Sequence, residues 1–209
     1  PLRRQRQMCI RDRFTRELKQ QCRIDEWILN DLCEDCGEKI EQLFPCFPPR
    51  FIAGDAETLS FPGKFDLIAS ASVFQWIKEP EVFFHKLSGL LVPQGVLLFS
   101  SFLPGNLHEI KVLTGEGLVY PTFDTLAGWL SAADFELLHS EEETIVLTFK
   151  TPLDVLRHLK ATGVTATGNG HWTRGRQESL CKQYSERFST SDDRVTLTYR
   201  PLYILAVKK

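Results

Sequence analysis

The sequence predicts an α/β domain built on a largely parallel β-sheet. Short apolar runs of strand length alternate with amphipathic helical segments over residues 14–102, which is the pattern of such domains. Polar residues follow these runs directly, at the positions where parallel sheets bind ligands. The 209 residues are 43% hydrophobic and 25% charged, which excludes a disordered tail, a collagen-like chain and a disulfide-stapled miniprotein. No apolar run is long enough for a transmembrane helix, so no membrane partner is expected.

The first elements follow from apolar spacing. Apolar residues spaced by four predict a helix over 14–22. The run EWIL predicts a strand over 26–29, and a second helical spacing over 32–44 ends at a proline-rich stretch. The run RFIA predicts another strand over 50–53, closed by Gly-Asp.

The next elements continue the alternation. The run KFDLIAS predicts a buried strand over 64–70, and an amphipathic helix is expected over 80–91. A Pro-Gln-Gly turn then leads into a strand over 96–102. Strands that alternate with helices in this way favour a parallel sheet.

The pattern changes after residue 102, where a helical lid is expected. Helices are predicted over 107–113, 122–130, 152–160 and 176–188, a hairpin-type strand pair over 135–150, a glycine- and threonine-rich loop over 163–175, and a closing strand over 195–207. We therefore expect one domain, residues 14–209, that carries an inserted helical lid.

Charge is distributed unevenly along a chain whose net charge is only −2, with a pI of about 6.3. Residues 79–149 carry ten acids against two Lys, whereas residues 151–209 carry ten Lys and Arg against five acids. The balanced total gives no general attraction to nucleic acid. The basic C-terminal part can receive an acidic partner, and the alternative is an ordinary solvated surface.

The six Cys residues indicate a reducing compartment, because no secretory or transit sequence is recognised. A cytoplasmic protein is therefore expected. Cys33 and Cys36, followed by Cys46, have the only metal-like spacing. A structural zinc site needs four ligands, so the prediction is free thiols and no metal.

Three predicted strands end in groups that suit a nucleoside ligand. Asp31 ends the first strand, and an ionised carboxylate there can accept hydrogen bonds from both ribose hydroxyls. Asp55 ends the second strand. Its carboxylate can accept a hydrogen bond from the adenine amine, while the Ala56 N–H donates one to a ring nitrogen of the adenine. Small residues at 70–72 end the third and let a ligand approach the backbone. The alternative is that the acids only form turns.

Longer motifs resemble a known family. The stretch FDLIASASVFQWIKEPEVFFHKLSGLLVPQGVLLFSSF resembles the fourth and fifth strands of class I S-adenosylmethionine-dependent methyltransferases. Within that group the motifs AGDAETLSFP, SVFQW, FSSFLPGNLHEIK, LDVLRHLKATGVTAT and LTYRPLYILAVKK are most similar to the malonyl-[acyl-carrier protein] O-methyltransferases of biotin synthesis. The resemblance covers residues 14–209. It implies a Rossmann-like sheet with helices on both faces and a helical lid.

The N-terminal part departs from this resemblance. Members of the group have a first strand and a GxGxG-type loop ahead of the first helix, and the chain shows neither. Residues 1–13 contain five Arg and the only Met, Met8, and are expected to be non-native or disordered. The chain is therefore interpreted as an N-terminally truncated member, with an inactive fragment as one alternative.

The resemblance also implies a set of site residues. The cofactor S-adenosylmethionine is expected on Asp31, Leu32, Asp55, Ala56, Ser70 and Ala71. Arg157, on the lid helix, is expected to hold the substrate carboxylate, and the alternative is an ion pair with Asp154 three residues earlier. No catalytic residue is expected. An ionised carboxylate needs no general base, and the alignment of the two reactants accounts for the rate acceleration.

The expected substrate is a malonyl thioester on acyl-carrier protein, with malonyl-CoA as a further possibility. The cations expected to face the acidic carrier protein are Arg174, Arg176, Lys182 and Arg187. Another small carboxylate or a phenol is the alternative acceptor. The histidines at 108, 158 and 171 are interpreted as ordinary surface or lid residues, and a monomer is expected.

Overall fold

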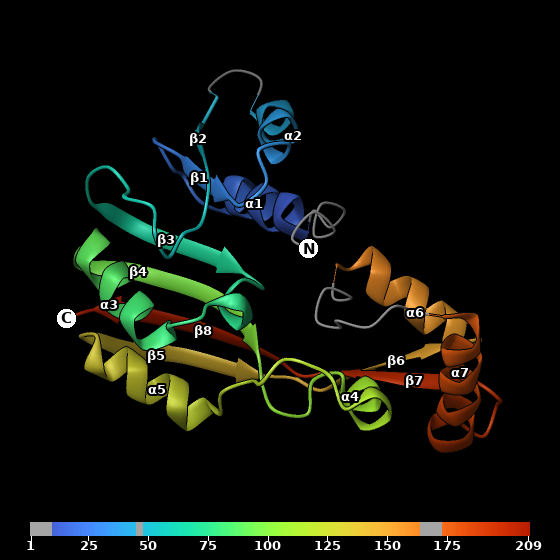
Figure 1. Ribbon diagram of the computed structural model, residues 1–209. Coiled ribbons are helices and arrows are strands. Elements are labelled where there is room, and N and C mark those ends of the chain that lie inside the picture. The colour runs from blue at the N-terminus through green and yellow to red at the C-terminus, as the bar shows by residue number, and fades with distance from the viewer. Residues whose placement is uncertain (1–9, 45–47, 164–172) are drawn as a thin grey trace. The chain divides into compact units, whose positions relative to one another are not determined.

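The computed structural model describes residues 10–44, 48–163 and 173–209 (Figure 1). The chain divides into two compact units, of which the first ends at Gly63 and the second is Lys64–Lys209. The sequence predicted a single domain from residue 14. Each unit is described by itself below.

The first unit contains two helices and a parallel pair of strands. In chain order these are α1 (Ile10–Gln21), β1 (Ile28–Asp31), α2 (Cys36–Leu43) and β2 (Arg50–Ala53). Helix α1 begins four residues before its expected start, so residues 10–13 are helical rather than part of a disordered segment. The remainder of that expectation, residues 1–9, lies outside the described chain.

Aromatic packing holds the first unit together. The rings of Trp27 and Phe44 meet edge to face with centroids 5.2 Å apart. Lys19 of α1 lies over the Phe44 ring, 4.7 Å from its centroid, and donates a hydrogen bond to the Leu43 carbonyl at 2.6 Å. A cation at a helix C-terminus satisfies a carbonyl that has no partner within the helix. Lys19 therefore joins α1 to the end of α2.

The second unit is built on a mixed four-stranded sheet. Its strands are β3 (Phe65–Ala71), β4 (Leu91–Phe102), β8 (Pro201–Lys208) and β5 (Phe135–Glu142), in that spatial order. β3 and β4 are parallel, whereas β8 runs antiparallel to both of its neighbours. The expectation of a largely parallel sheet is therefore confirmed, because β3, β4 and β5 run in the same direction and only β8 of these four strands runs the other way. The last strand returns between β4 and β5 without a crossover helix, and such a connection makes it antiparallel.

A long antiparallel ribbon connects this sheet to the lid. β5 pairs with β8, and β6 (Ile145–Phe149) pairs with β7 (Val195–Tyr199). The predicted hairpin over residues 135–150 is therefore wrong. β5 and β6 follow each other along the same side of the ribbon, and their partners lie in the C-terminal part of the chain. Strand periodicity marks which residues are extended but not which strand they pair with.

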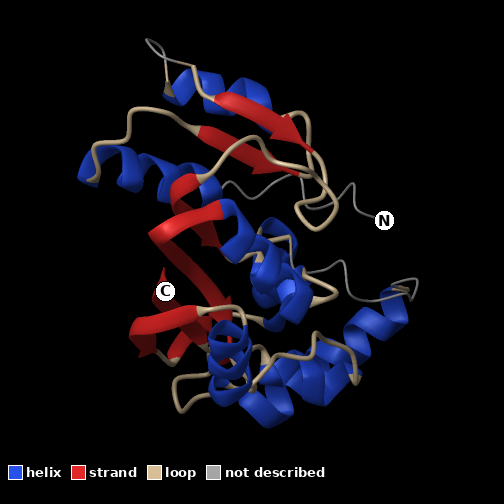
Figure 2. Cartoon of the chain, turned by 90° about the vertical axis from the view of Figure 1, so that its left-hand side faces the viewer, coloured by secondary structure: helices blue, strands red, loops and turns tan. Residues whose placement is uncertain are grey.

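Two helices and a short 3₁₀ turn cover one face of the four-stranded sheet (Figures 1 and 2). They are η2 (Phe74–Trp76), α3 (Pro80–Leu90) and α5 (Phe123–Ala132). The Phe74 ring stacks on Phe99 of β4 with centroids 4.1 Å apart, and on Phe84 of α3 at 5.2 Å. Each such buried ring contributes roughly 1.5–3 kcal/mol. This aromatic core holds the loop after β3 against the sheet.

The lid consists of the β6–β7 ribbon with α4 (His108–Thr114), α6 (Pro152–Ala161) and α7 (Arg174–Phe188). Thr151 and Thr173 begin α6 and α7 as N-caps, because their side-chain oxygens accept from backbone N–H groups in the first turn. The lid has its own apolar core, formed by Leu107, Val155, Leu159, Tyr184, Val195 and Leu197. The helices expected here are confirmed, and most of the expected loop over 163–175 lies outside the described residues.

Candidate functional site

The first unit brings two of the predicted cofactor acids to one edge of its sheet. Parallel pairing sets Asp31, the last residue of β1, opposite Ala53, the last residue of β2. The Gly54 N–H donates to the Asp31 carbonyl at 2.8 Å, and Asn30 Nδ2 donates to the Gly54 carbonyl at 3.0 Å. Asp55 follows directly after Gly54. Both acids therefore lie at the C-terminal edge of the strands, as the sequence predicts.

Gly54 is required at this turn for two reasons. Its φ of 139° is a conformation that side chains rarely adopt. A Cβ there would also lie 3.0 Å from a methyl carbon of Leu59. The glycine thus lets the chain leave β2 and place Asp55 beside the end of β1.

Each of the two acids also closes a turn. Asp31 Oδ1 accepts from the Cys33 N–H at 3.0 Å, and Asp55 Oδ1 accepts from the Glu57 N–H at 2.9 Å. The turn-forming interpretation is therefore correct in geometry. A carboxylate has about four acceptor positions, so a turn bond and a ligand bond are compatible on one side chain. Asp31 is only 7% exposed, whereas Leu32 beside it is exposed.

The remaining predicted cofactor residues are distributed over the two units. Ala56 lies in the turn after Asp55, in the first unit. Ser70 and Ala71 are the last two residues of β3, in the second unit, and pair with Phe99 and Ser100 of β4. They lie at the C-terminal ends of a parallel strand pair, which is where such sheets bind ligands.

Arg157 lies on the exposed side of α6. Its Nη1 donates to Asp154 Oδ1 at 2.9 Å, and its side chain is 68% exposed. Hydrogen bonds from Thr151, and then from Arg157, lower the pKa of Asp154. The ion pair considered from the sequence is therefore present. A guanidinium has five N–H donors, so this pairing is compatible with binding a second carboxylate.

The other side of α6 carries a histidine whose role the sequence did not show. His158 Nε2 lies 3.0 Å from the Tyr199 hydroxyl, and its ring contacts Phe149. Burial lowers the pKa of His158 and raises the pKa of Tyr199 to about 12. The Tyr199 ring in turn contacts Phe102, at the end of β4. His158 is therefore a partly buried residue of the lid, which was one of the two alternatives considered from the sequence.

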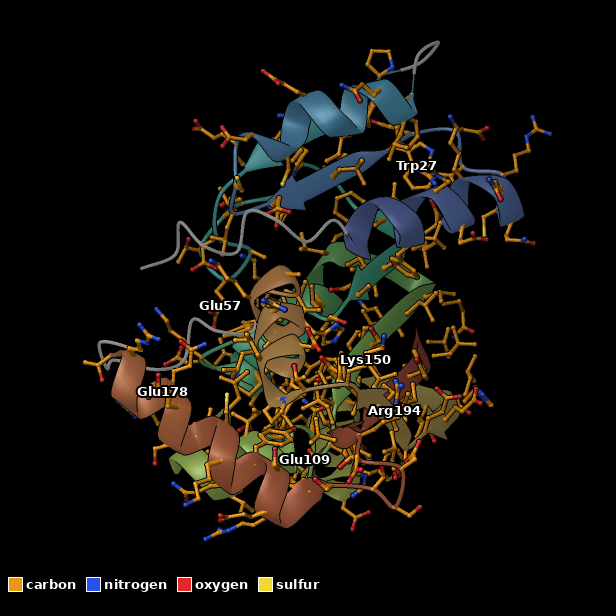
Figure 3. The ribbon with its side chains drawn as sticks, turned by 90° about the vertical axis from the view of Figure 1, so that its right-hand side faces the viewer. Trp27, Glu57, Glu109, Lys150, Glu178 and Arg194 are labelled. Atoms are coloured by element: carbon orange, nitrogen blue, oxygen red, sulfur yellow. The ribbon has the colours of Figure 1, made fainter. Side chains whose placement is uncertain are left out.

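A fully buried acid lies inside the lid and was also missed. Glu109 of α4 is 0% exposed, and its two oxygens accept from the Thr198 N–H at 3.0 Å and the Thr198 hydroxyl at 2.7 Å. Figure 3 shows Glu109 in the interior, whereas Glu178 lies on α7. Nearby, Asn106 Oδ1 accepts from the Arg200 N–H at 3.0 Å. Because these partners are about ninety residues apart in the chain, no local pattern could reveal them.

The basic residues predicted to face a carrier protein all lie on α7 and are exposed. They are Arg174, Arg176, Lys182 and Arg187. Two of them already pair with acids. Arg174 Nε lies 3.1 Å from Glu178 Oε1, and Arg176 Nη2 lies 3.6 Å from Glu116 Oε1. Exposed pairs of this kind contribute little to stability, so they can exchange partners.

Helix geometry divides these four cations into two pairs. At about 100° per residue, Arg174 and Lys182 lie on one side of the buried stripe that contains Tyr184. Arg176 and Arg187 lie on the other side of that stripe. The four cations therefore do not form one continuous face.

Three observations on the described residues concern other kinds of site. No group of three or more His, Cys, Asp or Glu side chains among them could hold a metal ion. Cys33 is a free thiol, and Cys46 lies outside the described range. No helix in this part of the chain has both the length and the apolar character needed to cross a membrane.

Comparison with known proteins identifies the fold. A methyltransferase domain family matches residues 9–99. The solved N-methyltransferase NodS of Bradyrhizobium japonicum, in complex with S-adenosyl-L-homocysteine, covers 93% of this chain and 71% of its own. It has a TM-score of 0.53 at 14% identity, which shows a shared fold. The matched family and the shared fold thus place the chain in the methyltransferase fold class.

Closer relatives identify the family. The malonyl-[acyl-carrier protein] O-methyltransferase of Porphyromonas gingivalis is 50% identical over 195 residues, which cover 92% of this chain and 74% of that protein. The enzyme of the same name from Bacteroides fragilis is 41% identical and covers 96% of this chain but 41% of its own, longer chain. The chain belongs to the malonyl-[acyl-carrier protein] O-methyltransferase family.

Proposed function

We propose that the protein transfers a methyl group from S-adenosylmethionine to the free carboxylate of a malonyl thioester carried by acyl-carrier protein. The product would be the malonyl methyl ester that enters biotin synthesis. The observation that carries this proposal is the 50% identity to a relative of that name over 92% of the chain. The geometry of α6 and α7 supports it, as the following paragraphs argue.

The acids of the first unit fit the nucleoside part of the cofactor. A ribose offers two hydroxyl donors, and the Asp31 carboxylate lies at the sheet edge as an acceptor. Asp55 lies on the same edge and suits the adenine amine, with the Ala56 amide beside it. When bound, S-adenosylmethionine supplies a methyl group on a positively charged sulfur. The family resemblance further implies that Leu32 contacts the adenosine and that the cofactor lies against the backbone of Ser70 and Ala71.

The substrate needs alignment rather than activation. A malonyl carboxylate has a pKa of about 4 and is ionised at neutral pH, so its oxygen can take the methyl group without a general base. Holding the two reactants in line can lower the activation free energy by roughly 7–11 kcal/mol. We assign the alignment to Arg157, whose planar guanidinium can bind a carboxylate through two parallel hydrogen bonds. An acetyl group has no carboxylate for Arg157 to bind, so this cation could not align it.

The carrier protein would bind along α7. An acidic carrier is attracted by Arg174, Arg176, Lys182 and Arg187, which lie exposed on that helix. Attraction between exposed charges speeds association and weakens as salt rises. Because the four cations form two pairs on different sides of the helix, one pair would carry most of the contact.

The setting of the reaction is also a proposal. The free thiols of Cys22, Cys33 and Cys181 favour a reducing compartment, in agreement with a cytoplasmic enzyme.

Methyl transfer to defined acceptors tests the proposed function. The protein is incubated with labelled S-adenosylmethionine and malonyl-carrier protein, malonyl-CoA, acetyl-carrier protein or a simple phenol. Mass spectrometry then locates the added methyl group. We expect the methyl ester on the malonyl carboxylate, with the carrier protein preferred over CoA and no product from the acetyl thioester. Transfer to the phenol at a higher rate than to both malonyl thioesters would refute the proposal.

A further inference from the structure

The turn after β3 contains a serine in a left-handed conformation. Ser72 has a φ of 53°, which residues other than glycine rarely adopt. It follows Ala71, the last residue of β3, at the edge where the parallel strands β3 and β4 end. Such a conformation persists only where surrounding groups hold it.

Hydrogen bonds hold Ser72 from two directions. Its N–H donates to Ser100 of β4, with the carbonyl oxygen at 3.2 Å and the hydroxyl oxygen at 3.0 Å. Its carbonyl oxygen accepts from Nε2 of Gln75 at 2.7 Å. Gln75 lies in the 3₁₀ turn η2, so it is the partner of Ser72 that comes from outside the sheet.

The oxygen atom of the Gln75 side-chain amide makes no comparable hydrogen bond among the described residues. This atom, Oε1, is buried. A buried amide oxygen without a partner destabilises the fold, and a methionine of similar size would avoid that cost. The presence of glutamine at position 75 is therefore explained by its Nε2, which holds the Ser72 carbonyl.

The residues on both sides of Gln75 are held in place by packing and hydrogen bonding. Phe74, the residue before it, is 6% exposed and stacks on Phe99 at 4.1 Å and on Phe84 at 5.2 Å. The Trp76 N–H, on the other side, donates to the Val73 carbonyl at 2.9 Å. Gln75 is thus anchored in the aromatic core while its Nε2 reaches the turn.

We propose that Gln75 is a positioning residue of this methyltransferase. It holds the left-handed Ser72 turn and, through that turn, the backbone of Ser70 and Ala71 against which the cofactor is proposed to lie. The inference deepens the proposed function and rests on that cofactor position. Its chemistry is local, because Nε2 bonds to a backbone carbonyl and carries no charge.

Two variants and their combination test this role. Gln75→Met removes the bond to the Ser72 carbonyl and also removes the unpaired oxygen. Ser72→Gly allows the left-handed conformation without strain, because glycine has no Cβ. If Gln75 acts by holding the turn, the double variant Ser72→Gly/Gln75→Met should recover what Gln75→Met loses, and Ser72→Gly alone serves as the control.

Hydrogen exchange measured by NMR provides the first readout. We expect the amide of residue 72 to lose protection by at least about tenfold in Gln75→Met and to regain it in the double variant, each relative to its own intrinsic rate. The urea midpoint should stay close to that of the wild type, since the lost bond and the removed unpaired oxygen offset each other. Unchanged protection in Gln75→Met would overturn the inference. This measurement needs neither cofactor nor acceptor, so it is independent of the proposed function.

The KM for S-adenosylmethionine provides the second readout. It should rise in Gln75→Met and return toward the wild-type value in the double variant, with a smaller change in kcat. A deprotected residue 72 with an unchanged KM would show that the turn does not shape the cofactor site. A double variant as impaired as Gln75→Met would show that Gln75 acts other than through Ser72. Either result overturns the proposal.

Discussion

The Glu109 carboxylate binds both hydrogen-bond donors of Thr198. It accepts from the Thr198 N–H at 3.0 Å and from the Thr198 hydroxyl at 2.7 Å. Glu109 lies in the first turn of α4, and Thr198 lies in β7. The contact therefore fixes α4 to the β6–β7 ribbon within the lid. The carboxylate is fully buried, so these bonds and others within the lid must compensate for the free-energy cost of removing it from water.

Removing this acceptor should destabilise the protein. In Glu109→Leu the buried Thr198 N–H loses its acceptor, which costs about 1–3 kcal/mol. Glu109→Gln should cost less, because the amide oxygen can accept from the N–H while the amide nitrogen donates to the hydroxyl. Urea unfolding measures both values. Glu178→Gln, which changes an exposed acid on α7, is the control and should stay within about 0.5 kcal/mol of the wild type. Equal stability of Glu109→Leu and the wild type would contradict the assignment.

Loss of charge at the strand ends should weaken cofactor binding without unfolding the protein. Asp31→Asn and Asp55→Asn keep an oxygen for the turn bonds but lose the ionised acceptor. We expect each to weaken affinity for S-adenosylhomocysteine by about 1–3 kcal/mol, or about 5- to 150-fold, in calorimetric titration of the protein. Asp25→Asn, an exposed acid of the same unit, is the control. A variant that unfolds yet binds normally would identify a purely structural turn residue.

Arg157 should control transfer to the malonyl group rather than cofactor binding. Arg157→Ala should lower kcat/KM for malonyl-carrier protein. The fall should correspond to a loss of about 1–3 kcal/mol in transition-state stabilisation, because a charged hydrogen bond to the carboxylate is lost. Arg157→Lys should recover only part of the rate, since an ammonium keeps the charge but not the two-bond geometry. Lys160→Ala removes an exposed cation one turn away on α6 and should behave as the wild type. Equal rates in all four proteins would exclude Arg157 from the site.

The two pairs of cations on α7 should differ in importance. Reversing one pair, in Arg174→Glu/Lys182→Glu or in Arg176→Glu/Arg187→Glu, should raise the KM for malonyl-carrier protein and remove its salt dependence. Malonyl-CoA should be affected less. Lys150→Glu/Lys209→Glu gives the same change in net charge outside α7. If neither pair differs from this control, the carrier protein binds elsewhere.

Acid should weaken the lid through His158. Burial lowers the pKa of His158 in the folded state, so the unfolded chain takes up a proton that the folded chain does not. The stabilisation is therefore present above the ordinary histidine pKa, about 6.5, and is lost as the pH falls through it. Unfolding free energies of the wild type and His158→Gln, measured from pH 7.5 to 5.5, should converge as the pH falls. Parallel curves would show that His158 does not contribute.

Much of this protein could be predicted from local sequence. The strands that became β2 and β3 and the helices that became α3, α6 and α7 follow from apolar spacing, prolines and caps within a few residues. The edge that carries Asp31 and Asp55 was also predictable, because parallel strands end on the same side. Motif order within residues 14–209 was sufficient to indicate the family, which the relatives confirm.

The tertiary structure decided which distant segments meet. β5 and β6 are recognisable as strands, but their partners β8 and β7 lie far away in the C-terminal part of the sequence, so the hairpin prediction failed. The bonds from Glu109 to Thr198 and from His158 to Tyr199 join residues 89 and 41 positions apart. Local periodicity reports which face of an element is apolar, whereas pairing depends on the packing of all elements together. Only the folded chain therefore shows that α4 and α6 are joined to β7 within the lid.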